Sequence, residues 1–171
     1  QESHFVATVT ALDHLGINVV DARIASSDQH VFNTFIVLEA NGQMVGERPT
    51  RHEQIRSTLV KHIQAEGRLK PVTRRRTPRV LKHFNFKTEV TIINDASHEN
   101  TILEVVTPDR PGLLTIIANI LVDMDIILQN AKITTLGERV EDVFYIVDRS
   151  LRPITYPDLC ELLRTRICNE L

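Results

Sequence analysis

The stretch Thr101-Ile-Leu-Glu-Val-Val-Thr-Pro-Asp-Arg-Pro-Gly-Leu-Leu114 predicts a buried strand, a tight polar turn and the start of a helix. The strand is indicated by a short run of aliphatic residues between turn residues. The run consists of Ile102, Leu103, Val105 and Val106. Asp109 is placed to cap the helix, and Pro111 suits its first turn. The turn is therefore either an ordinary capped connection or a small-ligand site. In the second case, helix-start N–H groups and the bare backbone of Gly112 receive a negative group such as a carboxylate.

The chain contains an internal repeat. A shift of 109 residues brings Phe5 onto Leu114, Ala22 onto Ala131 and Phe35 onto Phe144. A shift of 104 residues aligns a second helix, placing Ile55, Leu59 and Ile63 on Leu159, Leu163 and Ile167. The counterpart of the strand at 102–107 would precede residue 1. The first copy is therefore expected to lack its opening strand and to expose an unpaired sheet edge.

The repeated unit has the order strand, helix, strand, strand, helix, with a fourth strand possible, and the first copy begins at its helix. In the first copy, hydrophobic periodicity predicts a helix over His4–Leu15, strands over Ile17–Ser26 and Val31–Glu39, and a helix over Thr50–Ala65. This order predicts an α+β protein of two ferredoxin-like βαββα(β) units, each an antiparallel sheet with its helices on one face. The expected division is 1–72 for the first unit, 73–98 for a basic linker with strands, and 99–171 for the second unit.

The segment between the copies contributes further strands. Val80–Phe86 and Glu89–Ile93 have strand-like composition, and the polar stretch 94–100 is expected to form a loop. The fourth strand of the second copy is either absent or borrowed from Glu89–Ile93. Basic residues alternate with Phe84 and Phe86 in this segment, which is compatible with binding of single-stranded RNA. A strand with a solvated basic face is the favoured interpretation.

Composition indicates an ordinary soluble chain. It has 171 residues, 25% of them charged, and a net charge of −2, which gives no attraction to nucleic acid or to an anionic membrane. No apolar run approaches the ~18 residues of a membrane span. Cys160 and Cys168 are eight residues apart and fit no zinc pattern, so we expect reduced thiols in a cytoplasmic protein. The chain begins at Gln1 without an initiator methionine, and we expect it to be part of a longer protein.

The sequence contains no catalytic motif that we can identify. HExxH, GxSxG and Walker patterns are absent, and the seven histidines form no metal-ligand pattern. The acidic residues Glu138, Glu141 and Asp142 follow the Leu136-Gly137 turn, where they could form an acid pair or a metal site. A charged hairpin rim, partly neutralised by Arg139, is the favoured interpretation.

Two stretches resemble a known family. Asp109-Arg-Pro-Gly-Leu-Leu114 is similar to the strand-to-helix loop of ACT domains, which are small amino-acid-sensing modules. Asn130-Ala-Lys-Ile-Thr-Thr-Leu-Gly-Glu-Arg-Val-Glu-Asp-Val-Phe144, with Arg75-Arg-Thr-Pro78 upstream, resembles the C-terminal ACT pair of the bifunctional uridylyltransferase/uridylyl-removing enzymes. Those enzymes modify the PII nitrogen-signalling protein. The resemblance extends over nearly the whole chain.

The resemblance implies a regulatory role without catalysis. In that family the ACT pair senses glutamine and shifts the enzyme between attaching and removing UMP. The catalytic domains are not visible here, so we expect no cofactor and no metal in this segment, and Mg only for those missing domains. The implied partners are free glutamine, the PII protein and the parent's catalytic domains, together with self-association through sheet edges. Nucleic acid and membrane are not expected as partners.

The resemblance also implies a ligand site where one unit's loop meets a strand of its neighbour. The carried-over loop positions are Asp109, Arg110, Pro111, Gly112, Leu113 and Leu114, and the strand positions are Asn130, Ala131 and Lys132 with their equivalents Asp21, Ala22 and Arg23. Helix-start N–H groups at Gly112 and Leu113 would take the ligand carboxylate. Asp109 or Asp21 would take its ammonium, and Asn130 its side-chain amide. Two rivals remain open: a single-stranded RNA-binding sheet and a purely structural dimerisation unit.

Overall fold

A computed structural model describes residues 2–26, 30–65, 86–94 and 99–171. In chain order the elements are α1 (Glu2–His14), β1 (Ile17–Ser26), β2 (Val31–Glu39), α2 (Pro49–Gln64), β3 (Glu89–Ile93), β4 (Thr101–Pro108), α3 (Leu113–Asp123), β5 (Ile127–Lys132), β6 (Thr135–Leu136), β7 (Arg139–Val147) and α4 (Pro157–Glu170). Both strands expected in the first copy have the predicted bounds, because apolar and polar residues alternate along each of them.

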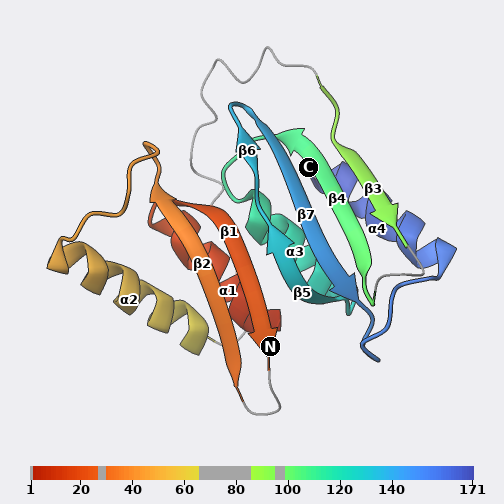
Figure 1. Cartoon of the computed structure of the whole chain (residues 1–171), viewed down its shortest axis with the longest axis horizontal. Coiled ribbons are helices and arrows are strands. Elements are labelled where there is room, and N and C mark those ends of the chain that lie inside the picture. Colours follow the sequence, from red (N-terminus) through yellow and green to blue (C-terminus); the bar gives the residue numbers. More distant parts are fainter. Residues whose placement is uncertain (1, 27–29, 66–85, 95–98) are drawn as a thin grey trace.

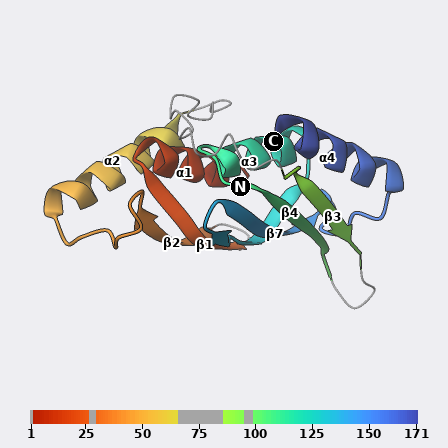
Figure 2. The same cartoon turned by 90° about the horizontal axis from the view of Figure 1, so that it is seen from above.

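The strands form one antiparallel sheet. Its order is β2-β1-β5-β7-β4-β3, and the short β6 pairs with β7 (Figure 1). The four described helices lie on the same face of this sheet, and no described helix covers the other face (Figure 2). The predicted class is confirmed, because the structure is α+β with an antiparallel sheet, helices on one face, and two ferredoxin-like units.

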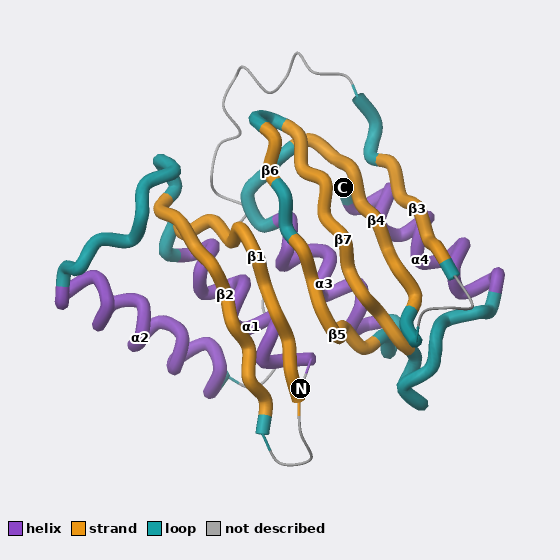
Figure 3. The backbone as a smooth tube through the Cα atoms, in the orientation of Figure 1, coloured by secondary structure: helices purple, strands orange, loops and turns teal. Residues whose placement is uncertain are grey.

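The two units meet where β1 pairs with β5. Ala22 pairs with Ala131, and Arg23 pairs with Asn130. The separation 131 − 22 = 109 equals the repeat shift, so each alanine faces its own repeat equivalent. The seam therefore has local twofold symmetry. Both alanines are buried, and α1 packs against α3 above them, as the tube in Figure 3 also shows.

The second unit has a complete four-stranded layer. Its strands follow the order β5-β7-β4-β3, and β3 pairs with β4 from Glu89↔Val106 to Ile93↔Ile102. Glu89–Ile93 therefore supplies the fourth strand, as one of the two sequence alternatives held. α4 lies over β3 and buries Leu163 and Ile167 completely.

The first unit has only β1 and β2 in the described part of the chain. Its second helix, α2, packs on α1 and has no buried residue. Phe5 of α1 stacks on Phe35 of β2 with ring centroids 5.9 Å apart. Arg51 of α2 donates two hydrogen bonds to the Glu39 carboxylate, at 2.8 and 2.6 Å, which ties the helix to the end of β2. The Arg51–Glu39 ion pair therefore helps to attach α2 to the sheet, whereas α4 is attached by buried apolar side chains.

The strand-to-helix turn differs from the prediction at one point. Gly112, with φ 78°, is the N-cap of α3, and no side chain caps this helix. The expectation that Asp109 caps the helix is therefore wrong, because two turn residues separate it from the N-cap. The predicted strand at 80–86 lies almost wholly outside the described residues. No described helix has both the length and the apolar character needed to cross a membrane.

A candidate ligand site between the two units

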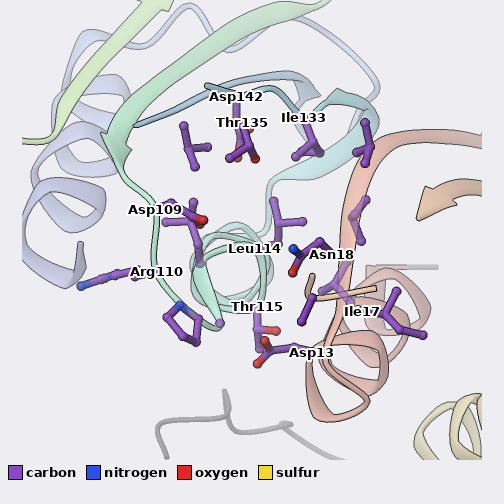
Figure 4. A pocket seen from close by; sticks show the side chains of 18 of the residues that line it. Asp13, Ile17, Asn18, Asp109, Arg110, Leu114, Thr115, Ile133, Thr135 and Asp142 are labelled. Atoms are coloured by element: carbon purple, nitrogen blue, oxygen red, sulfur yellow. The ribbon is translucent and has the colours of Figure 1, made fainter. Parts of the chain in front are cut away.

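A cavity of about 650 Å³ opens at the junction of the two units, directly on the Asp109–Leu114 loop (Figure 4). This volume lies within the usual range for small-molecule sites. Both units contribute to its lining, which consists of Val9, Asp13, Ile17, Asn18, Val19, Val20, Leu38 and Ala40 from the first, and Asp109, Arg110, Pro111, Gly112, Leu113, Leu114, Thr115, Ile133, Thr135, Val140 and Asp142 from the second. The six predicted loop residues are therefore all on the cavity wall.

The start of α3 provides one polar end of the cavity. The Leu113 N–H donates to the Arg110 carbonyl at 3.3 Å, and the Ile116 N–H donates to the Gly112 carbonyl at 3.0 Å. The N–H groups of Leu114 and Thr115 lie in the first helical turn, where no intrahelical acceptor exists. Together with the helix dipole, they favour a negative group at this point.

Asp142 of β7 provides a second polar end. It is only 1% exposed, and its Oδ1 accepts a hydrogen bond from the Thr134 N–H at 3.1 Å. Its Oδ2 is buried and has no hydrogen-bond partner among the described residues. Burial raises the pKa of the Asp142 carboxyl to about 7, and the nearby Asp109 carboxylate contributes to the increase.

Asp142 corrects the sequence interpretation. The prediction that it belongs to a charged hairpin rim is wrong, because the side chain is buried on the core side of the sheet. The signal was present in the sequence. Asp142 occupies every second position together with the buried residues Val140, Phe144 and Ile146, so all four side chains lie on the same face of β7.

The two charged loop residues point in different directions. Asp109 is half-buried with its carboxylate turned inward, and burial raises its pKa although the Arg110 N–H binds the carboxylate (Figure 4). The Asp109 N–H donates to the Glu138 carbonyl at 2.8 Å, which fixes the loop against the β6–β7 turn. The Arg110 guanidinium extends away from the cavity and donates to the Glu170 carbonyl of α4.

The first unit contributes Asn18, whose side chain points toward the cavity (Figure 4). Sequence reasoning missed it, because only the packing of one unit on the other brings it to the loop. On the same side, the Thr10 hydroxyl of α1 donates to the Thr115 hydroxyl of α3 at 3.2 Å, within the buried contact between these helices.

The predicted strand residues lie beside the cavity rather than on its wall. Ala22 and Ala131 are buried in the seam, while Arg23, Asn130 and Lys132 are exposed next to it. Asp21 and Arg23 form an ion pair at 3.6 Å, and Asn130 accepts a hydrogen bond from the Ala131 N–H at 2.8 Å. The part of β1 that lines the cavity is Ile17–Val20, earlier in the strand.

The arrangement suits a small zwitterion. Helix-start N–H groups lie at one point of the wall, and carboxylates lie at another. Among the described residues, no group of three His, Cys, Asp or Glu side chains is placed to hold a metal ion. The wall can bind and orient a ligand that carries both charges.

Comparisons with known proteins agree with the resemblance seen in the sequence. The chain is 47% identical to the bifunctional uridylyltransferase/uridylyl-removing enzyme of Stutzerimonas stutzeri over 172 residues, which cover all of this chain and 19% of that protein. Enzymes of the same name from Pseudomonas putida and Azotobacter vinelandii match at 47% and 46%, with the same coverage. The chain thus spans about a fifth of the length of these relatives. No family model and no solved structure matches it.

Proposed function

We propose that this chain is the amino-acid-sensing region of a uridylyltransferase/uridylyl-removing enzyme. It would consist of two ACT units that bind glutamine between them. One observation carries this proposal, namely the cavity of about 650 Å³ whose wall joins the Asp109–Leu114 loop of one unit to the start of β1 in the other. The high identity to enzymes of that name over the full chain supports the choice of parent.

Each polar group of glutamine finds a complement on the wall. The α-carboxylate binds the N–H groups of Leu114 and Thr115 at the start of α3. The α-ammonium lies on the carboxylate side, near Asp109. The side-chain amide reaches Asn18 of the first unit. The methylenes contact apolar wall residues such as Leu114 and Ile133.

Signal transmission follows from the position of the site. Among the described residues, β1 of the first unit and β5 of the second pair at two positions, and α1 packs against α3 above them. A ligand that contacts both walls binds one relative orientation of the units more tightly than others, and so shifts the population of orientations. In the parent enzyme this shift would bias the attachment or removal of UMP on the PII protein. The catalytic domains and their Mg would lie in the remaining four-fifths, in the cytoplasm.

A second candidate function rests on the outer edge of the first unit. β2 pairs with β1 along one side, and no described strand pairs along its other side. Phe32 and Ile36 of this strand are 65% and 55% exposed. Such an edge can pair with another chain, which would make the region a dimerisation unit.

Thermal melting across a panel of free amino acids tests the main proposal. Saturating glutamine should raise the midpoint by several degrees, because a ligand at 100 times its Kd adds about 2.7 kcal/mol. Sedimentation with and without glutamine tests the second candidate. A dimer that forms without ligand, together with an unchanged melting midpoint for every amino acid, would favour dimerisation and overturn the sensing role.

A further inference from the structure

We propose that Asp142 is a specificity-determining residue of this cavity: its buried carboxylate receives the ammonium group of the ligand, so that the cavity selects zwitterions without a second negative charge. This inference rests on the proposed function, since it requires a free amino acid in the cavity. It adds a residue on β7 to the loop residues that the sequence indicated.

The geometry of Asp142 provides the first argument. The Thr134 N–H holds Oδ1 at 3.1 Å, which fixes the carboxylate with Oδ2 free. Figure 4 shows the carboxylate directed into the cavity, above Asp109 and Leu114. A buried carboxylate oxygen without a partner is unfavourable, and native proteins almost always satisfy such groups. A ligand N–H placed in the cavity would satisfy this one.

The charges around Asp142 provide the second argument. Asp109 faces it from the loop, and Asp13 lines the same cavity from α1. Arg110 is the basic residue of the described wall, but its guanidinium is directed toward the Glu170 carbonyl of α4. The residue paired with Asp142 on the neighbouring strand β4 is the apolar Val105. No side chain of the described wall therefore brings a cation to Asp142, and a ligand ammonium would supply it.

The repeat provides the third argument. The equivalent of Asp142 in the first copy is Asn33, a neutral side chain of the same shape. Asn33 is not among the residues that line this cavity. The negative charge at this strand position therefore occurs in the copy that carries the loop. The substitution Asp142→Asn introduces the residue that the first copy already has at the equivalent position, Asn33.

An acidic wall has a consequence for ligand choice. Glutamine places one ammonium and one carboxylate in the cavity, whereas glutamate replaces the amide beside Asn18 with a second carboxylate in a cavity that Asp13, Asp109 and Asp142 also line. Like charges in a partly dehydrated site repel more strongly than in water. The cavity should therefore prefer glutamine to glutamate.

Calorimetric titration of the whole chain tests these statements with three ligands: glutamine, glutamate and glutaramate, which is glutamine without its α-amino group. A charge-assisted hydrogen bond contributes about 1.5–3 kcal/mol, so glutaramate should bind about tenfold or more weakly than glutamine. Asp142→Asn should lose a similar factor for glutamine and should reduce the discrimination against glutamate. Asn33→Ala is the matched control and should bind as the wild type does.

The outcomes separate the inference from the proposed function. If the wild type binds glutamine, and Asp142→Asn binds it equally well with unchanged discrimination, the inference is overturned and the sensing role stands. Equal binding of glutaramate and glutamine by the wild type would also overturn it, without any variant. If the wild type binds no amino acid, the proposed function fails and this inference fails with it.

Discussion

The helices α2 and α4 carry the same apolar pattern but are buried to very different degrees. Ile55, Leu59 and Ile63 of α2 correspond to Leu159, Leu163 and Ile167 of α4. Ile167 is fully buried, whereas Ile63 is 41% exposed. The difference comes from the sheet, because α4 covers β3 beside β4, and the described part of the first unit has no strands in the matching places. An amphipathic stripe therefore creates a core only where strands lie beneath it.

The site shows the same asymmetry between the units. The second unit contributes the loop, the start of α3 and Asp142, while the first contributes the facing wall from Ile17 to Val20. Neither unit forms the cavity alone. A repeat whose strands match mainly at apolar positions can thus produce a single asymmetric site, because the polar residues differ at matched positions such as Asn33 and Asp142.

The largest expected effect tests the contrast between the helices. Ile167→Ala removes a buried side chain from the four-stranded unit and should lower the free energy of unfolding by about 2–5 kcal/mol. Ile63→Ala, at the matched position of α2, should cost less than about 1 kcal/mol because its side chain is already exposed. Urea denaturation followed by circular dichroism measures both. Equal losses would mean that α2 and α4 are buried alike in solution.

The next effect concerns the charge difference between Asp142 and Asn33. The pKa of Asp142 is about 7 in the folded chain and 3.8 for an unperturbed carboxyl. Between about pH 4 and about pH 7 the folded chain therefore keeps a proton on this carboxyl that the unfolded chain has released. Its contribution to stability is therefore present below about pH 4 and is lost as pH rises through about 7. A difference of about three pKa units, at roughly 1.4 kcal/mol per unit, makes this loss on the order of 4 kcal/mol.

Asp142→Asn removes this dependence, so the variant should be more stable than the wild type at pH 8, with the difference disappearing toward pH 4. Unfolding in urea at several pH values measures it. Asp109 and Asp13 also line the cavity, so Asp109→Asn serves as the control and should show a smaller change. Parallel stability curves for the wild type and Asp142→Asn would contradict the burial of an uncompensated carboxylate.

A smaller effect compares two glycines in the left-handed conformation. Gly112 at the cavity has φ 78°, and Gly42 in the loop after β2 has φ 80°. Alanine at either position should cost about 1–2 kcal/mol, because L residues are strained there. Only Gly112→Ala should also weaken glutamine binding, since it changes the start of α3 at the cavity. Titration of both variants measures this, and equal affinities would place the ligand away from the loop.

The smallest effect concerns the ion pair that holds α2. Arg51→Gln removes the bonds to Glu39 and to the Leu15 carbonyl, and should lower the urea midpoint slightly. Arg51 lowers the pKa of Glu39 through this hydrogen bond, so the loss should be greatest above the normal pKa of a carboxyl and smaller at high salt. A midpoint that falls by the same amount in low and high salt would show that packing, not charge, attaches the helix.

Much of this fold could be predicted from the chain because the repeat and the alternation along β1, β2 and β7 are local signals. The sequence alone does not decide whether Glu89–Ile93 joins the sheet, because its pairing with β4 depends on contacts between segments that are separate in sequence. The cap of α3 differs from the prediction, since Gly112 with its positive φ is the N-cap and Asp109 is not. Asn18 could not be identified, because its place at the cavity arises only when two units pack together.

The most direct test is a glutamine titration followed by amide chemical shifts of the labelled chain. The account predicts that the largest shifts occur on both walls of the cavity, at Leu114 and Thr115 in the second unit and at Asn18 in the first, with little change at the distant Gly42. Shifts confined to one unit, or an unchanged spectrum at saturating glutamine, would contradict a ligand bound between the two units.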